Sequence, residues 1–384
     1  MRITMIEKDI KTTESAEEVK EEKEVKIYAT AEQLRADIIK LCSIPSLSGF
    51  EYRASDRVKE IYGEYFDEIK TDLVGNQILL RRCTKENAPK ILVDAHFDEV
   101  GMIVSDVLEG GFLRMVKVGG IDPAIMQAAD VVVCGNEEIR GVVISTPPHL
   151  RAGGDGKLPP VEELLVDVGL GYTLDELREL IPIGSPIVYA AAYSDLGEKY
   201  IAGKSFDDKA CGAIAARAII DTPREELAGD IYLCFSAREE TSMYGGALSA
   251  TYKTEPDYAM VIDVNLGNAP DVPAIETVKM GGGISVSYSA ATHRELTKMT
   301  IELCKQKDLP VIPTAAPSST GTNAPTVNLV RDGVPTVDVG LPLRNMHTYN
   351  EVIHLGDCNV LCGAVREFIC SAEIAERFGR EEIL

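Results

Sequence analysis

Several side chains that can bind metal ions follow or end apolar runs in this 384-residue sequence. They are two histidines and three carboxylates, namely His96, Asp207, Glu240, Asp263 and His347. In an open α/β sheet the carboxyl ends of the strands are where ligands bind. A mixture of imidazole and carboxylate ligands favours zinc, cobalt, manganese or iron over magnesium or calcium. Each feature alone is weak evidence, but their coincidence in one domain indicates a metal site.

Two further carboxylates lie beside these candidate ligands and could orient them or move protons. Asp98 follows His96 at the spacing His-x-Asp, which brings a carboxylate close enough to hold the imidazole in one tautomer. Glu239 precedes Glu240 directly after an apolar run, where two adjacent acids are costly unless a positive charge neutralises them. A solvated loop would explain this pair equally well, and a helix N-cap would explain Asp207.

The candidate ligands need rigid elements to bring them together, and the hydrophobic pattern predicts such elements. Short, nearly continuous apolar runs are typical of strands buried on both faces of a sheet. They occupy residues 90–95, 230–236, 258–264 and 336–340. Helical spacing marks residues 34–41, 52–65, 210–220, 293–307 and 359–377, with Thr30 and Gln33 as a capping box before the first of these helices. This alternation predicts an α/β domain with helices layered on a sheet.

The segment over residues 103–193 differs in composition from its surroundings. It holds short strand candidates separated by Gly, Pro and Asn turns, at residues 112–118, 131–134, 140–145 and 164–168. This pattern predicts a small, β-rich domain inserted into an α/β domain that comprises residues 27–102 and 194–384. Residues 1–26 are rich in Glu and Lys with little to bury, so we expect a charged, flexible extension there.

The bulk composition argues against several classes of partner. The formal net charge of −22 disfavours binding to nucleic acid and to anionic membranes. No apolar run approaches the roughly 18 residues of a membrane-spanning helix, and the charged N-terminus lacks a signal-peptide core. The nine cysteines are odd in number and form no Cys-x-x-Cys pair. We therefore expect a reduced, cytoplasmic protein.

An ordered set of motifs also resembles one known family. The sequence His96-Phe97-Asp98-Glu99-Val100-Gly101 is similar to the His-x-Asp-Glu-Val/Ile-Gly motif of the glutamyl or deblocking aminopeptidases. These enzymes are often called tetrahedral (TET) aminopeptidases, and some members have carried the name cellulase or endoglucanase. The resemblance covers roughly residues 30–375 and continues through Gly119-Gly120-Ile121-Asp122-Pro123, Pro147-Pro148-His149-Leu150, Phe206-Asp207-Asp208-Lys209, Glu239-Glu240, Val261-Ile262-Asp263-Val264, Met346-His347-Thr348 and Glu351-Val352.

The resemblance implies a fold, an activity and an assembly. The fold would be a mixed central sheet sandwiched by helices, similar to zinc exopeptidases, with a PDZ-like β domain inserted at residues 103–193 for dimerisation. The activity would be removal of N-terminal residues from peptides with free N-termini. The assembly would be dimers, built further into a tetrahedral dodecamer.

By the same resemblance, the chain would hold two divalent metal ions, zinc or cobalt, with manganese as a further candidate. One ion would be held by His96, Asp207 and Asp263, and the other by Asp207, Glu240 and His347. Asp207 would bridge the two ions. Glu239 would act as the general base on a water activated by both metals, and Asp98 would orient His96.

Other enzyme classes remain as alternatives. A related dinuclear hydrolase, such as a carboxypeptidase or deacylase, would use the same types of ligand. A glycosidase fits less well, because it needs two carboxylates facing each other across a sugar, and Glu239 and Glu240 are neighbours. The chain also lacks Trp, the best residue for stacking on sugars.

Three loops depart from the family pattern without removing a proposed ligand. Lys209-Ala210-Cys211-Gly212 stands where Arg-x-Gly-Cys is typical, so the last pair is reversed. Thr241-Ser242 replaces Val-Gly after the glutamate pair, and Asn323 replaces an Asp in the loop 321–324. We expect these changes to affect substrate preference and turnover.

Overall fold

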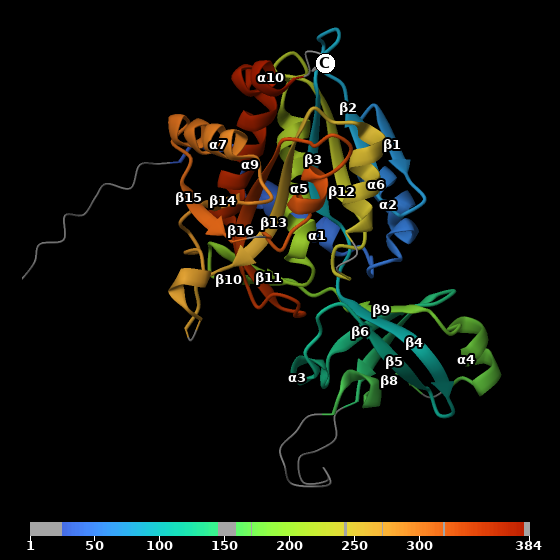
Figure 1. Cartoon of the computed structure of the whole chain (residues 1–384). Coiled ribbons are helices and arrows are strands. Elements are labelled where there is room, and N and C mark those ends of the chain that lie inside the picture. The colour runs from blue at the N-terminus through green and yellow to red at the C-terminus, as the bar shows by residue number, and fades with distance from the viewer. Residues whose placement is uncertain are drawn as a thin grey trace, which may run out of the picture.

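The computed structural model describes residues 25–144, 159–169, 171–241, 244–270, 272–317 and 319–379. The extension predicted at residues 1–26 falls almost entirely outside the described residues. The motif Pro147-Pro148-His149-Leu150 and Ser242 also lie outside them. The described chain forms a large α/β part and a smaller β-rich part at one end of its sheet (Figure 1).

Within the described residues the α/β part is built on an eleven-stranded mixed sheet. The four central strands β12, β3, β13 and β16 are parallel to one another, whereas the strands beyond β12 and β16 in the main order pair antiparallel. The order is β1-β2-β12-β3-β13-β16-β17-β11-β10, with β14 beside β16 and β15 beside β14. In that order the bounds are Glu68–Thr71, Gln77–Arg81, Asp230–Ser236, Lys90–His96, Tyr258–Leu266, Thr336–Arg344, Glu351–His354, Tyr200–Gly203 and Ser194–Leu196, followed by Ile284–Ser289 for β14 and Val311–Ala316 for β15.

Helices cover both faces of this sheet (Figure 1). One face carries α1 (Ala31–Cys42), α5 (Phe206–Asp221), α7 (Arg294–Gln306) and α9 (Leu355–Cys370). The opposite face carries α6 (Gly245–Thr254) and α8 (Ala324–Asn328), which also contact each other. The remaining helices of this part are α2 (Ser55–Tyr62), which follows a 3-10 turn at Glu51–Ala54, and the C-terminal α10 (Ala372–Phe378).

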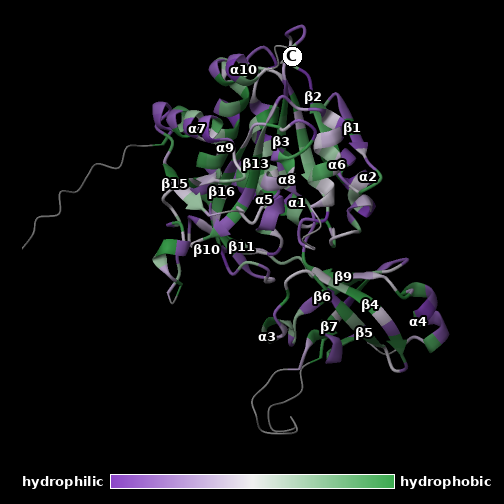
Figure 2. Cartoon of the chain, viewed as in Figure 1, coloured by the Kyte–Doolittle hydropathy of each residue, from purple (hydrophilic) through white to green (hydrophobic). Residues whose placement is uncertain are grey.

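Burial on both faces explains why the central strands are nearly continuous apolar runs. On β3, Ile91, Val93 and Ala95 join the core under α1, α5 and α9, whereas Leu92 joins the core under α6 and α8. Successive side chains of a strand point to opposite faces, so a strand between two helix layers has no polar face. The apolar strands at the centre of the molecule are visible in Figure 2.

The predicted central strands and most predicted helices are confirmed, with two differences at helix ends. The predicted helix over residues 359–377 is two helices, because α9 ends at Cys370 and the Ser371 side chain accepts from the Ile374 amide to begin α10. The predicted helix over residues 52–65 begins as a 3-10 turn and ends at Tyr62. The capping box of Thr30 and Gln33 before α1 is confirmed.

The β-rich part is a closed barrel of six strands among the described residues, in the order β4-β5-β8-β7-β6-β9. Its hydrophobic core is separate from that of the large sheet. The strands are Gly101–Leu108, Phe112–Val118, Asp130–Cys134, Glu138–Val143, Leu165–Asp167 and Pro186–Tyr189 for β4 to β9, with short helices α3 (Pro123–Met126) and α4 (Leu174–Leu180). Strand β4 thus begins two residues before the predicted start of the insertion at residue 103.

None of the helices in the described part of the chain is both long enough and apolar enough to span a lipid bilayer.

Candidate metal centre

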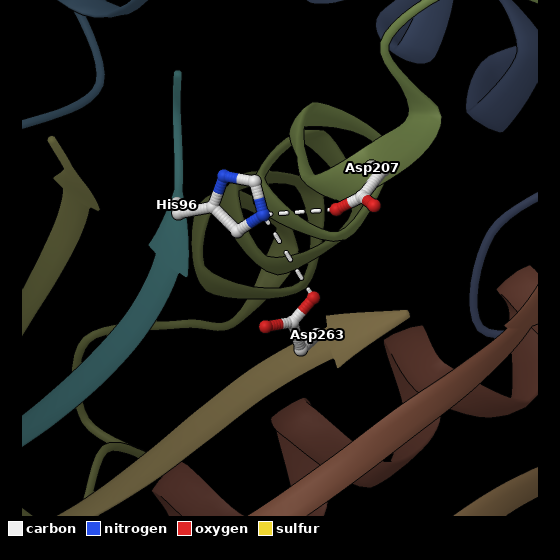
Figure 3. A group of neighbouring side chains, drawn as sticks. All are labelled: His96, Asp207 and Asp263. Carbon is white, nitrogen blue, oxygen red and sulfur yellow. Dashed lines mark hydrogen bonds and ion pairs between the residues drawn. The ribbon is translucent and has the colours of Figure 1, made fainter. Parts of the chain in front are cut away.

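Three of the predicted ligands meet at the carboxyl ends of central strands (Figure 3). His96 is the last residue of β3, Asp207 lies in the first turn of α5, and Asp263 lies on β13. His96 Nε2 is 2.9 Å from Asp207 Oδ1 and 3.9 Å from Asp263 Oδ1. All three side chains are buried. One imidazole and two carboxylates therefore converge on a space suited to a divalent cation.

A second group of donors shares Asp207 with the first. Asp207 Oδ2 lies 3.4 Å from His347 Nε2, and Glu240 Oε2 lies 3.2 Å from the same nitrogen. The donor atoms of these three residues all lie within 4.8 Å of one another. The two oxygens of Asp207 thus face the two groups, an arrangement that allows one carboxylate to bridge two cations.

The contact between Asp207 and His347 changes the pKa of both side chains. Burial opposes ionisation of Asp207, but hydrogen bonds from His347 and His96 outweigh this effect and lower the pKa of Asp207. Burial likewise opposes charge on His347, yet Asp207 and Glu240 raise its pKa to about 11. A metal ion must displace such protons from imidazole before it can bind there.

Asp98 contacts more than the histidine that it was expected to orient. His96 Nδ1 lies 3.1 Å from the backbone carbonyl oxygen of Asp98 and 3.6 Å from its Oδ1 atom. The two carboxylate oxygens of Asp98 accept the backbone amides of Glu239 and Glu240, at 3.1 and 3.0 Å. The fully buried Asp98 therefore connects one candidate ligand to the segment that bears two others.

Glu239 belongs to neither donor group and instead lines a pocket over them. Burial raises the pKa of Glu239 to about 7, with the negative charge of Glu240 adding to the effect against that of His96. A carboxylate with a pKa near 7 is matched to accept a proton at neutral pH. Both adjacent glutamates therefore line the pocket, but only Glu240 belongs to a donor group.

The pocket has a volume of about 310 Å³ and opens above the donor atoms. Its apolar wall comes from Tyr244, Val264 and Met346, and Gly120 contributes from the segment after β5. The Gly120 carbonyl oxygen lies 3.1 Å from His347 Nδ1. The pocket therefore combines four carboxylates and an imidazole with a partly apolar wall.

Comparison with known proteins assigns the chain to a family. A family model described as M42 glutamyl aminopeptidase matches residues 75–362. The chain belongs to this M42 family. Among curated relatives, lysyl aminopeptidase of Pyrococcus furiosus is 30% identical over 325 residues, which cover 83% of this chain and 91% of that protein.

Solved structures resemble this M42 protein over nearly its whole length. Aminopeptidase APDkam598 from the archaeon Desulfurococcus kamchatkensis is 27% identical with a TM-score of 0.82, and the match covers 92% of this chain and 99% of that one. The TET1 peptidase of Pyrococcus horikoshii, which can assemble into a tetrahedron or a large octahedral shell, is 27% identical with a TM-score of 0.76. That match covers 88% of this chain and 99% of the other. Membership of the M42 family supports aminopeptidase activity.

Glu351 is a further residue at this M42 site, although its motif alone indicated no role for it. Its buried Oε2 atom accepts the amides of Phe206 and Asp207, at 2.7 and 3.2 Å. Its Oε1 atom accepts the amide of His347 at 2.9 Å. Glu351 therefore ties together the two segments that carry the shared carboxylate and the second histidine. Its sequence signals are the family-like pair Glu351-Val352 and an acid that begins an apolar run.

A buried charge network supports the start of α5 from the other side. Glu99 Oε1 accepts from Lys209 Nζ at 2.9 Å and from the Ser46 amide at 3.0 Å, while Oε2 accepts from Ser205 Oγ at 2.6 Å and from Lys204. Burial alone would raise the pKa of Glu99, but the two lysines lower it to about 2. Burial lowers the pKa of Lys209, one of the departures from the family pattern, and the negative charge of Glu99 opposes this effect.

Asn323, one of the departures from the family pattern, contacts residues of the strands next to the candidate ligands. Its Nδ2 atom donates to Asp94 Oδ2 at 3.0 Å and to Ser236 Oγ at 2.9 Å. Ser236 pairs with His96 in the register of β12 and β3, and Asp94 lies two residues earlier on β3. Asn323 therefore supports β3, which carries His96, and its neighbour β12.

Proposed function

We propose that this M42 protein is an aminopeptidase that removes N-terminal residues from peptides with the help of two divalent metal ions. The observation that carries the proposal is the pair of donor groups that share Asp207. One group would hold the first ion, and the other group would hold the second. Zinc or cobalt is the expected metal, with manganese as a further candidate, because the donors mix imidazole with carboxylate.

The electrostatics of the pocket support the presence of cations. Four carboxylates line it, but no lysine or arginine does so among the described residues. Burial raises the pKa of Asp263 well above its usual range, with the nearby charge of Asp208 adding to the effect. Gathering ionised acids without a cation is costly. Two divalent ions would neutralise this charge.

The proposed reaction assigns separate tasks to the side chains. Two bound ions would supply Lewis acidity, which lowers the pKa of water and polarises the peptide carbonyl. Glu239 would take the proton of the attacking water and deliver it to the leaving amine. Glu240 would hold an ion. Asp98 would fix the position of His96 relative to the segment that bears the two glutamates.

We also propose an assembly and a location. The barrel would be the PDZ-like dimerisation domain that the family resemblance implies, and dimers would build a tetrahedral dodecamer. The assembly of the Pyrococcus horikoshii relative supports this proposal. A cytoplasmic location is supported by nine free cysteines, seven of them buried.

One experiment tests the function directly. A peptide is digested in free and N-acetylated forms, each with and without a chelator, and the released residues are identified. We expect release from the free N-terminus only, and loss of release when the chelator is present. Release from the C-terminus would favour a carboxypeptidase, and rapid internal cleavage of the acetylated peptide would make the protein an endopeptidase. Activity that survives complete metal removal would contradict the two-metal proposal.

A further inference from the structure

The segment that bears both glutamates is held by side chains rather than by regular secondary structure. Directly after β12, four consecutive backbone amides donate to side-chain oxygens from distant parts of the chain. The bonds run from Ala237 to Asn76 Oδ1 at 2.9 Å, from Arg238 to Glu51 Oε1 at 2.9 Å, and from Glu239 and Glu240 to Asp98 Oδ1 and Oδ2 at 3.1 and 3.0 Å. Asn76, Glu51 and Asp98, which we call the amide clamp, are all fully buried.

The clamp is needed because the chain leaves the strand in an unusual conformation. Arg238 has a φ of +64°, in the left-handed region that only a few per cent of non-glycine residues adopt. The chain approaches the clamp closely at Gly246, where a Cβ atom would lie 2.1 Å from the Ala237 carbonyl oxygen and 2.6 Å from Asn76 Oδ1. Such a conformation persists only where the surroundings determine it. The directions of the Glu239 and Glu240 side chains therefore depend on the clamp.

Glu51 is the member of the clamp that accepts hydrogen bonds only from this turn and from its own loop. Its Oε1 atom accepts the amides of Gly49 at 2.8 Å and Arg238 at 2.9 Å, and its buried Oε2 atom has no hydrogen-bond partner. Asp98, by contrast, also contacts His96. Asn76 also donates to Asp72 and to Gly246. Glu51 neither belongs to a donor group nor lines the pocket.

We propose that Glu51 is a positioning residue for Glu239. The proposal rests on the function proposed above, in which Glu239 is the general base. Glu51 fixes the amide directly before Glu239, so it sets the direction in which the base leaves the turn. It acts through the hydrogen bonds accepted by Oε1, and its negative charge is not required. A base that is displaced by about 1 Å can lose on the order of a hundredfold in rate.

Two variants of similar size separate the hydrogen bond from the charge. Glu51→Gln keeps an acceptor oxygen for the two amides, whereas Glu51→Met keeps the volume and removes the acceptor. We expect Glu51→Met to lower kcat at least about tenfold, with KM changed less than about threefold and metal content unchanged. Glu51→Gln should restore kcat to within about threefold of the wild type. If Glu51→Met does not fold, Glu51→Asp serves instead, because it moves the acceptor back by one methylene. This variant should likewise lower kcat while KM changes less than about threefold.

A matched control separates positioning from general loss of stability. Asp357 is another buried carboxylate that accepts two backbone amides, those of Gly281 at 2.7 Å and Gly283 at 2.8 Å, and it does not line the pocket. Asp357→Leu should lower the unfolding temperature to a similar extent while kcat stays near that of the wild type.

The outcomes also distinguish failure of this inference from failure of the proposed function. Equal kcat values for Glu51→Met and Asp357→Leu would overturn the inference, and so would a Glu51→Gln variant as slow as Glu51→Met. Either result would leave the function standing, provided that the wild type releases N-terminal residues and Glu239→Gln does not. A wild type without aminopeptidase activity would overturn the function itself.

Discussion

Replacing Glu239 or Glu240 by Gln separates the roles of two adjacent side chains. Either substitution preserves the size of the side chain and removes one negative charge. Glu240 Oε2 lies 3.2 Å from His347 Nε2 within the second donor group, whereas Glu239 lies outside both groups. We therefore expect Glu239→Gln to keep about two metal ions per chain and Glu240→Gln to keep about one.

The expected rates follow from the same geometry. Burial raises the pKa of Glu239 to about 7, as a proton acceptor at neutral pH requires. Gln cannot accept a proton, and removal of a general base typically costs ~10²–10⁴ in kcat. That loss corresponds to about 3–5 kcal/mol of activation free energy. Glu240→Gln instead weakens the binding of one ion, so excess metal should restore part of its activity.

The assay measures metal content and kcat on the same preparations. Metal analysis after dialysis gives the ions per chain, and hydrolysis of a peptide with a free N-terminus gives kcat with and without added zinc or cobalt. If Glu239→Gln loses metal while Glu240→Gln keeps both ions, the two assignments are reversed. If both variants retain full activity, the catalytic site lies elsewhere in the molecule.

Four further predictions concern the whole protein. Chelation should lower the unfolding temperature as well as the activity, because it leaves four pocket carboxylates without cations, and calorimetry before and after metal replacement measures this change. Burial raises the pKa of Asp338 from 3.8 to about 6, so the stability that it contributes is full below about pH 4 and is lost as the pH rises through about 6. The free energy of unfolding of Asp338→Asn, relative to that of the wild type, should therefore rise by up to about 3 kcal/mol as the pH is raised from 4 to 8. Urea unfolding of both proteins at each pH measures this difference. A peptide with N-terminal Leu should be cleaved faster than one with N-terminal Glu, because Val264 and Met346 line the pocket and no described lysine or arginine does; competition between the two peptides tests this. Light scattering at micromolar concentration should show a large oligomer, and a monomer alone would contradict the proposed assembly.

The sequence predicted the central fold because burial on both faces leaves a strong signal. The runs at residues 90–95, 230–236 and 258–264 are mainly apolar, since helices pack on each side of β3, β12 and β13. His96, Glu240 and Asp263 followed from the same runs, because parallel strands end at one edge of the sheet, whereas Asp207 was identified in a motif that opens a helix. The strand signal in the barrel was weaker, since β8 has only three residues.

The buried acids outside the donor groups could not be predicted from pattern. Glu51 stands between Phe50 and Tyr52 at the start of a helix-like segment, where an acid normally faces solvent. Its burial depends on Arg238 and Gly49, whose amides it accepts. Glu351 is buried for a similar reason, because it accepts three amides from two other segments. Only the tertiary structure brings such donors and acceptors together.

The distribution of the donor groups along the chain has a consequence for biosynthesis. The first histidine ends β3, yet the neighbours of β3 in the sheet are β12 and β13, which are translated more than a hundred residues later. The second histidine is later still, at residue 347. Such long-range pairing closes slowly and late in folding. A growing chain therefore cannot assemble both donor groups before residue 347 has left the ribosome, so the proposed peptide hydrolysis would begin only after that point.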